Sequence, residues 1–346
     1  MYIGLTGYMA SGKGEAAEIL KKFGFNYCSL SDVVREEASS QSLEHTRENL
    51  IKAGNELRSK HGAFYFAKKI AEKVSRESDK DWVIDGIRNP KEAKELYKLV
   101  DFKMLGLSAK PETIVERILS RKRDGDSITK EQILEKLNIE KGGGQPEDGQ
   151  QVAKCLNMVD FLVVNEGTKQ ELEDKINHFV NLLKGLERPN FHEVFMEIAY
   201  SWAERSTCLR RKVGAVIAKE SQQLTAGYNG APKGLKHCKE LGGCLREKLG
   251  IPSGQRHEIC RGTHAEQNAI TQAAKFGINI DGGTLYCNTH PCTICTKMII
   301  NAGIKKVVYD SDYDDELSKQ ILGEQKELEI IRYEGLRPKQ IYQMVN

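Results

Sequence analysis

Short apolar runs alternate with longer amphipathic stretches in the first half of the chain. The runs lie at 2–6, 82–84, 102–107 and 160–164, and helical periodicity fills much of the sequence between them. Strands that alternate with helices in this way predict a doubly wound parallel sheet. We therefore expect an α/β domain over residues 1–185.

The pattern changes at 184–190, where the helical periodicity of the preceding residues is interrupted. Residues 191–205 have the pattern of an amphipathic helix, and two strand-like runs at 213–218 and 224–228 are joined by a polar turn, which predicts a hairpin. Helical and strand-like segments then alternate toward the C-terminus. We expect a linker at 186–190 and, over residues 191–346, a second α/β/α domain with a mixed five-stranded sheet.

The composition is that of an ordinary globular protein. Of 346 residues, 39% are hydrophobic and 29% are charged, and no apolar run approaches the length of a membrane span. The N-terminus has no signal-peptide pattern, so we expect a cytoplasmic protein. The net charge of +3 lacks the basic excess of a protein that binds nucleic acid through its phosphates, which favours a small-molecule substrate. Nine cysteines in such a chain indicate thiols and metal ligands rather than disulfides.

Two short stretches of the second half carry the clearest chemistry. They are His264-Ala265-Glu266, and a Pro-Cys-x-x-Cys run that ends with Cys292 and Cys295. One His and two Cys supply three protein ligands, and catalytic zinc uses three protein ligands and keeps its fourth position for water. Glu266 follows the His by two residues, where it could act as a general acid and base on that water. A CxxC pair alone would also fit a redox pair or half of a structural zinc site, but the joint pattern is the signature of zinc nucleobase deaminases.

A second group of metal-ligand residue types precedes this pattern. Three cysteines and a histidine would close a tetrahedral structural zinc site and hold the long 230–262 segment, which has little apolar content of its own. Reduced cysteines without a metal are the alternative. The candidate ligands of this second Zn²⁺ are Cys238, Cys244, His257 and Cys260, with His237 beside them.

The first strand is followed by the loop Gly7-Tyr8-Met9-Ala10-Ser11-Gly12-Lys13 and then by a helix. This is the arrangement of a P-loop, in which backbone N–H groups cradle phosphates and the lysine neutralises them. Gly14 stands where the signature has the Ser or Thr that binds Mg²⁺, so phosphate binding is favoured over efficient phosphoryl transfer. Asp85, at the end of the apolar run 82–84, is a candidate Mg²⁺ contact, with a surface turn residue as the alternative. The nucleotide site, for ATP or another nucleotide, would comprise Gly7, Gly12, Lys13, Gly14 and Asp85.

The second domain resembles the cytidine and deoxycytidylate deaminase family, and its deoxycytidylate branch most. Besides the metal motifs, the resemblance rests on residues 205–215, 227–232 and 264–270, and it covers nearly all of 190–315. It implies hydrolysis of dCMP or dCTP to the deoxyuridine nucleotide and ammonia, by a zinc-activated water that attacks C4 of cytosine. Glu266 would take a proton from that water and deliver protons to N3 and to the leaving amine. The branch commonly forms homo-oligomers.

The same resemblance implies the substrate contacts. Asn229 would bind the sugar hydroxyl, an aromatic ring from Tyr309 or Tyr313 would pack beside the base, and backbone groups around Ala265 and Thr289 would hold the edge of the base. A substrate phosphate needs cations, and the candidates are Arg210, Arg211 and Lys212, for which a solvated turn is the alternative.

The first domain resembles the nucleoside and nucleotide kinase superfamily through its loop and the motifs at 31–36, 54–58 and 85–88. A P-loop domain joined to such a deaminase resembles bacterial antiphage deoxycytidine-nucleotide deaminases, which deplete the nucleotide pool. That resemblance implies a regulatory first domain that senses a nucleotide effector; a kinase or a scaffold are alternatives. Two other functions stay open at this point: a bifunctional nucleotide kinase and deaminase, and a nucleic-acid-editing cytosine deaminase that acts on a flipped or single-stranded base.

Overall fold

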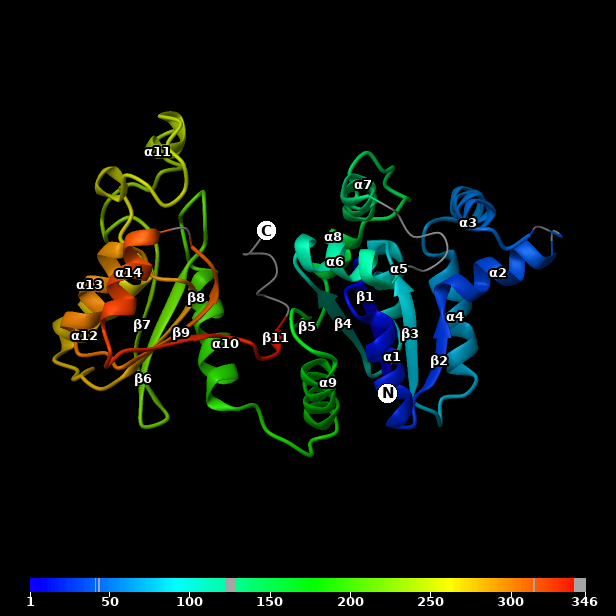
Figure 1. Ribbon diagram of the computed structural model, residues 1–346, viewed down its shortest axis with the longest axis horizontal. Coiled ribbons are helices and arrows are strands. Elements are labelled where there is room, and N and C mark those ends of the chain that lie inside the picture. The colour runs from blue at the N-terminus through cyan, green and yellow to red at the C-terminus, as the bar shows by residue number, and fades with distance from the viewer. Residues whose placement is uncertain (41, 43, 122–128, 314, 339–346) are drawn as a thin grey trace. The chain divides into compact units, whose positions relative to one another are not determined.

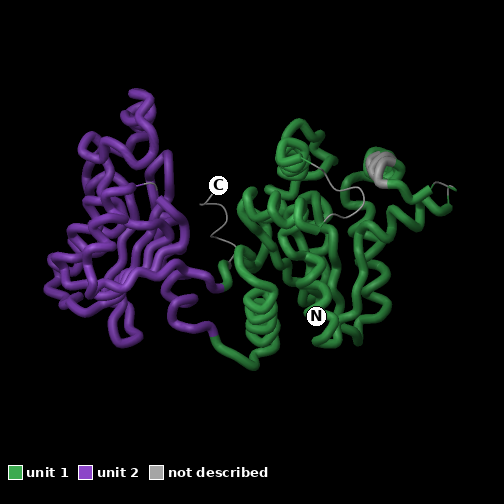
Figure 2. Tube along the Cα trace, viewed as in Figure 1, with its two compact units in different colours: residues 1–188, 336–342 green, residues 189–335, 343–346 purple. Residues whose placement is uncertain are grey.

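The computed structural model describes residues 1–40, 42, 44–121, 129–313 and 315–338 (Figure 1). The chain forms two compact units: Met1–Arg188 with a segment that begins at Leu336, and Pro189–Gly335 (Figure 2). This division differs from the predicted domain 191–346, because residues 336–338 belong to the first unit and 339–346 lie outside the described residues. The physical reason is a short strand, β11 (Arg337–Pro338), that pairs with a strand of the first unit.

The first unit is built on five parallel strands in the order β5-β4-β1-β3-β2, and β11 is an antiparallel edge beside β5. The strands are β1 (Tyr2–Gly7), β2 (Asn26–Ser29), β3 (Trp82–Ile87), β4 (Phe102–Ser108) and β5 (Phe161–Val164). The helices are α1 (Lys13–Lys22), α2 (Leu30–Ser40), α3 (Arg47–His61), α4 (Tyr65–Ser75), α5 (Pro90–Leu96), α6 (Pro111–Arg121), α7 (Lys130–Lys141), α8 (Val152–Leu156) and α9 (Lys169–Leu183).

Apolar residues on both faces of this sheet explain the double layer of helices. Tyr2 and Ile84 belong to a core that includes residues of α2 to α8, whereas their neighbours Ile3 and Val83 belong to a second core with α1 and α9. Successive strand residues point to opposite faces, so a continuous apolar run buries both. The predicted doubly wound parallel sheet is confirmed.

The second unit contains a mixed sheet in the order β10-β9-β8-β6-β7, as predicted. β10, β9 and β8 are parallel, and β6 is antiparallel to both β8 and β7. The strands are β6 (Gly214–Lys219), β7 (Gln222–Tyr228), β8 (Thr284–Thr289), β9 (Lys306–Ser311) and β10 (Glu329–Arg332). The helices are α10 (Phe191–Ala203), α11 (Leu245–Lys248), a 3₁₀ turn at His257–Ile259, α12 (Ala265–Phe276), α13 (Thr293–Asn301) and α14 (Glu316–Glu324).

Helix α10 packs on β6 and β8, and α12, α13 and α14 share a core with alternate residues of the strands. Gly227 brings α12 close to β7, because a Cβ at this position would lie 2.4 Å from the carbonyl oxygen of Ala265 and 2.6 Å from the nitrogen of Ala269. The close approach fixes the N-terminal end of α12, where the site begins. Within the described residues, no helix has the length and apolar character needed to cross a membrane.

Candidate active site

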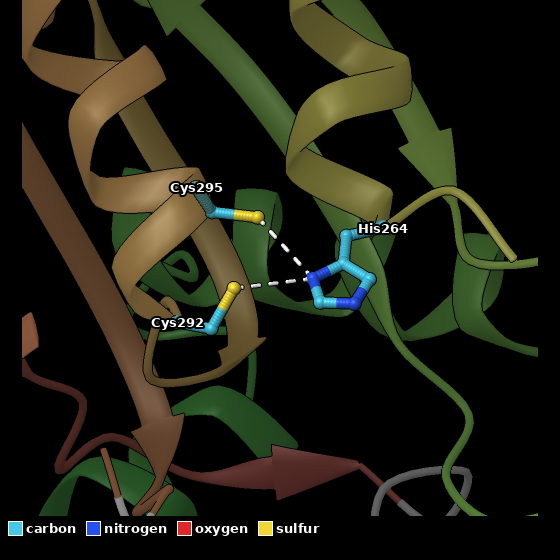
Figure 3. A group of neighbouring side chains, drawn as sticks. All are labelled: His264, Cys292 and Cys295. Carbon is cyan, nitrogen blue, oxygen red and sulfur yellow. Dashed lines mark hydrogen bonds between the residues drawn. The ribbon is translucent and has the colours of Figure 1, made fainter. Parts of the chain in front are cut away.

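Three side chains from two helix starts converge in the second unit. His264 immediately precedes α12, Cys292 is the N-cap of α13, and Cys295 lies one turn further along. The Nδ1 atom of His264 is 3.3 Å from Sγ of Cys292 and 3.4 Å from Sγ of Cys295 (Figure 3). In the described parts of the chain, this is the only group of three or more His, Cys, Asp or Glu ligand atoms that all lie within 4.8 Å of one another.

The local sequence explains this convergence. The N–H of His264 donates to Oε1 of Gln267, 2.8 Å away, which fixes the first turn of α12 next to the histidine. Cys292 and Cys295 are three residues apart at the start of α13, so their sulfurs lie on one side of the helix. One nitrogen and two sulfurs form the donor set that zinc prefers, with a position left for a non-protein ligand.

The pKa values of the two cysteines shift in opposite directions. The Cys295 thiol donates to Cys292 and, with His264 beside it, lowers the pKa of Cys292 to about 4. The same pairing, together with burial, raises the pKa of Cys295 well above its ordinary value. The lowered pKa favours the thiolate of Cys292, which is the form of cysteine that binds metal. These residues fit a zinc ion.

Glu266 is buried in the first turn of α12, with 3% of its surface exposed, and it lines the same pocket as His264 and Cys292. Burial raises the pKa of its carboxyl, because removal from water disfavours the charged form. A carboxyl whose pKa moves toward neutrality can both accept and return a proton, as a general acid and base must.

The pocket has a volume of about 100 Å³. Of the two predicted aromatic residues, Tyr313 lines the pocket, whereas Tyr309 does not and packs edge-on against His290 with 4.8 Å between ring centroids. Lys212 is exposed and does not line it. The other predicted substrate contacts among the lining residues are Asn229, Ala265, Thr289, Arg210 and Arg211.

Asn229 holds the neighbouring loop in place. Its Nδ2 donates to the carbonyl of Arg211 at 2.8 Å, and its Oδ1 accepts from the Val213 N–H at 2.8 Å and from the Ser206 hydroxyl at 2.5 Å. An amide nitrogen carries two hydrogens, so one N–H of Asn229 remains for a substrate hydroxyl. The same side chain thus positions the arginines and lines the pocket.

The sequence reasoning missed Arg246, which lines the same pocket although it lies 18 positions before His264. It is buried, with 7% of its surface exposed. No local motif distinguishes it from the surface charges around it, because its burial depends on how the 230–262 segment folds back. A buried guanidinium is the signal that only the structure provides.

The predicted second metal group is not assembled in the structure. Cys238, Cys244 and Cys260 line two neighbouring cavities, but these cysteines and His257 do not form a group of ligand atoms within 4.8 Å. The His257 ring instead packs edge-on against the ring of His264, with 5.1 Å between centroids. Burial raises the pKa of Cys238, with further contributions from Cys244, Cys260 and Cys208. Cys208, which the sequence analysis did not include, therefore lies near this group.

In the first unit, the predicted P-loop joins β1 to α1. Gly12, the N-cap of α1, has a left-handed backbone with φ 107°, which favours glycine. Nζ of Lys13 donates to the carbonyl oxygens of Gly7 at 2.8 Å and Tyr8 at 2.7 Å. Burial lowers the pKa of Lys13 to about 8, and Glu140 opposes that shift. The space around Gly14 is open, so nothing replaces the missing hydroxyl from within 4 Å of a Cβ at that position.

The loop already binds a carboxylate of the same chain. The backbone N–H of Met9 donates to Oε2 of Glu140, near the end of α7, at 2.7 Å. A P-loop offers its backbone N–H groups to phosphate oxygens. Glu140 thus occupies a donor that a nucleotide phosphate would use.

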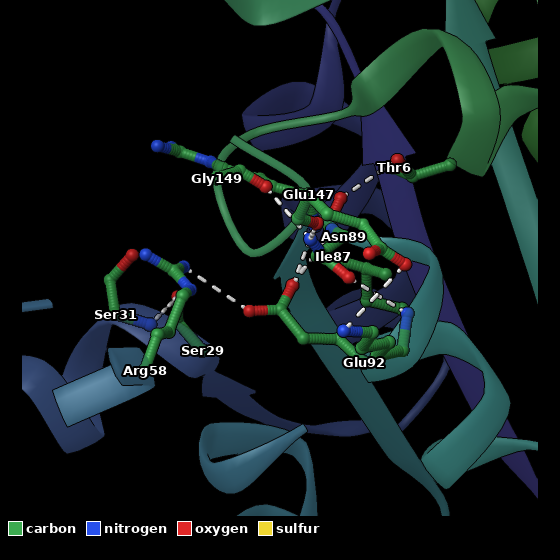
Figure 4. A network of polar contacts seen from close by, with 11 residues as sticks. Thr6, Ser29, Ser31, Arg58, Ile87, Asn89, Glu92, Glu147 and Gly149 are labelled. Carbon is green, nitrogen blue, oxygen red and sulfur yellow. Dashed lines mark hydrogen bonds and ion pairs between the residues drawn. The ribbon is translucent and has the colours of Figure 1, made fainter. Parts of the chain in front are cut away.

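Asp85 lies within β3, two residues before the strand ends at Ile87, and a buried polar network follows that end (Figure 4). The fully buried Glu92 accepts from the N–H groups of Arg88 at 2.9 Å and Asn89 at 3.0 Å, and from Nη2 of Arg58 at 3.2 Å. This network holds the chain that leaves β3 in a fixed conformation. Asp85 itself accepts from the N–H of Gly86 at 2.6 Å and from the hydroxyl of Tyr27 at 3.2 Å.

Comparison with known families divides the chain as the two units do. Residues 189–311 match the family model of the cytidine and deoxycytidylate deaminase zinc-binding region, and residues 6–135 match an AAA domain model. The zinc-binding region contains all three residues of the His264 group and Glu266.

Two curated relatives extend over more of the chain. The deoxycytidylate deaminase of Saccharomyces cerevisiae is 33% identical over 66% of this chain and 74% of its own length. That of Schizosaccharomyces pombe is 29% identical over 90% of this chain and 91% of its own length. A solved dCMP deaminase from the cyanophage S-TIM5, in complex with dCMP and dUMP, is 33% identical over 42% of this chain and 99% of that chain, with a TM-score of 0.34.

Proposed function

Because the chain belongs to the cytidine and deoxycytidylate deaminase family, we propose that it deaminates a deoxycytidine nucleotide, with dCMP as the first candidate and dCTP as the second. The observation that carries the proposal is one pocket in which His264, Cys292 and Cys295 approach one another beside the buried carboxyl of Glu266. The products are the deoxyuridine nucleotide and ammonia.

His264, Cys292 and Cys295 would hold the zinc ion, which when bound supplies the Lewis acidity that lets water lose a proton near neutral pH. Glu266 takes up that proton on its carboxylate and delivers it to N3 of cytosine; it then takes the remaining proton of the hydroxyl that has added to C4 and delivers it to the departing amine, which leaves as ammonia. Its burial suits both steps, because a raised pKa makes the carboxylate a stronger base toward the proton that it accepts and later returns.

The pocket walls would hold the rest of the substrate. The ring of Tyr313 packs beside the base, the free N–H of Asn229 binds a sugar hydroxyl, and Ala265 and Thr289 hold the edge of the base. Arg210 and Arg211 supply positive charge on the same wall, which a phosphorylated nucleoside would neutralise.

Ammonia release tests the proposal. The purified chain is incubated with dCMP, dCTP, deoxycytidine and cytidine, with and without a zinc chelator, and metal content is measured in parallel. We expect turnover of the deoxynucleotides that the chelator abolishes and added Zn²⁺ restores. Chelator-resistant turnover would contradict the zinc assignment, and turnover of a polynucleotide cytosine alone would contradict the small-molecule substrate. Two zinc ions per chain would support the second metal site, and one would reject it.

We also propose that the P-loop unit regulates the deaminase by binding a nucleotide effector, with or without Mg²⁺. The S. pombe relative matches 90% of this chain, which supports a place for both units in one nucleotide-metabolising protein. We extend the proposal in three ways: the protein forms a homo-oligomer, it acts in the cytoplasm, and its activity depletes nucleotides in defence against phage. If the antiphage role is correct, Glu266→Ala abolishes protection of cells, and equal protection by this variant would reject it.

A further inference from the structure

Arg246 is a positive charge in the wall of the deaminase pocket. It belongs to α11, in the segment that runs from β7 to α12, and it is 7% exposed. The pocket that it lines also contains His264, Glu266 and Tyr313. A charged side chain that is this buried is rare in proteins unless it forms an ion pair with a group of opposite charge.

In the part of the chain that the structure describes, the one hydrogen-bond acceptor found for Arg246 is a neutral carbonyl group, which does not balance its positive charge. Its Nη2 donates to the carbonyl oxygen of Pro252 at 3.3 Å, and its Nε is buried without a partner. Among the described residues, no carboxylate forms an ion pair with it. A guanidinium has five donors, so most of its capacity remains available to a ligand.

Two further arginines, Arg210 and Arg211, line the same pocket. Nη1 of Arg210 is also buried without a partner, and Arg211 lies over the ring of Tyr313, 5.4 Å from its centroid. Of the described residues that line the pocket, Glu266 is the only one with a carboxyl. The three arginines therefore outnumber the acidic groups of the described pocket lining, Glu266 and the Cys292 thiol, and this balance of charge fits an anionic ligand.

We propose that Arg246 binds the phosphate group of the substrate and thereby makes the pocket prefer a nucleotide over the corresponding nucleoside. The inference rests on the proposed deaminase function and adds a specificity-determining residue to it. A guanidinium binds two oxygens of a phosphate at once, with charge-assisted hydrogen bonds that a single ammonium cannot reproduce. A guanidinium offers only hydrogen-bond donors and no acceptor, so the role of Arg246 is recognition and not chemistry.

A structural alternative has a different consequence. Arg246 also lines the second cavity, together with Cys238, Cys244 and Cys260. If thiolates of these cysteines formed ion pairs with Arg246, its loss would destabilise the 230–262 segment. Turnover of every substrate would then slow equally. The two roles therefore differ in the ratio of activities toward dCMP and deoxycytidine.

The experiment compares Arg246→Met with the wild type by kcat/KM for dCMP and for deoxycytidine. Methionine keeps much of the apolar stem and removes the charge. We expect kcat/KM for dCMP to fall about 30- to 100-fold, the loss typical of hydrogen bonds to a charged group, and that for deoxycytidine to change less than about threefold. Arg246→Lys should recover part of the loss. Lys248→Met is the matched control, because it removes an exposed cation from the same helix, and it should match the wild type.

Binding provides a second readout that does not depend on turnover. Calorimetric titration with dUMP and with deoxyuridine should show that Arg246→Met weakens binding of the phosphorylated ligand selectively. Equal losses for both substrates or both ligands, loss of metal from the variant, or an unchanged preference for the nucleotide would overturn the inference. Wild-type protein that binds dUMP tightly but deaminates no cytosine nucleotide would instead reject the proposed function and leave the binding test of Arg246 intact.

Discussion

The deaminase pocket and the P-loop both offer donors to an anion, but they differ in what those donors contact. In the pocket, Arg210 and Arg246 each have a buried nitrogen without a partner. In the P-loop, the N–H of Met9 donates to Glu140, and Lys13 donates to two backbone carbonyls. The pocket therefore has donors available for an external ligand, whereas the Met9 N–H and the Lys13 ammonium of the P-loop already donate to groups of the same chain.

This difference matters for affinity. A ligand of the pocket gains hydrogen bonds without breaking others, because unpartnered buried donors gain most from a new acceptor. A nucleotide at the P-loop must first displace the Glu140 carboxylate and redirect Lys13, and this cost lowers its apparent affinity. Occupation of such a site would therefore need a higher nucleotide concentration than occupation of an open P-loop.

The largest effect should come from Glu266→Gln, which keeps the shape of the side chain and removes its ability to carry a proton. We expect kcat to fall by about 10²- to 10⁴-fold, the usual range for a general acid and base. Metal content should stay at the wild-type value, because Glu266 is not one of the three ligand residues. A variant that keeps a tenth or more of the wild-type rate would show that another group carries the proton.

The next effect should appear at the other site. Glu140→Gln removes the negative charge that competes with phosphate, so we expect ATP to bind about tenfold more tightly, measured by calorimetry in Mg²⁺ and in chelator. Glu135→Gln changes an exposed residue of the same helix and should leave affinity unchanged. Weaker binding of ATP to Glu140→Gln, especially only when Mg²⁺ is present, would mean that Glu140 holds the metal instead of excluding the nucleotide.

The smallest effect concerns pH. Burial lowers the pKa of Lys13 to about 8, so the ammonium form that attracts phosphate is present below this pH and is lost as the pH rises through it. With that value, ATP affinity should fall about fourfold between pH 7 and pH 8.5. Because Glu140 raises the pKa of Lys13, Glu140→Gln should move the midpoint to lower pH. Lys13→Arg, which stays charged, should abolish the dependence; a dependence that persists would assign it to another group.

Features that depend on residues close in sequence could be predicted. Cys292 and Cys295 are one helical turn apart, and Glu266 follows His264 by two residues, so local geometry already limits where their side chains lie. The alternation of strands and helices likewise predicted both sheets. The same reasoning could not choose between Tyr309 and Tyr313, because both lie near one strand end and only packing decides which ring reaches the pocket.

The sequence by itself determined the two sheets, the P-loop and the residues of the zinc motif, because each is encoded by periodicity or by short spacing. Only the tertiary structure decided that Arg246 is buried in the pocket, that Glu140 reaches the N–H of Met9 across 131 positions, and that β11 returns to the first unit. These contacts join segments far apart in the chain. The residues that make these contacts are of types common on protein surfaces. No local sequence pattern indicates which distant residue each of them contacts after folding.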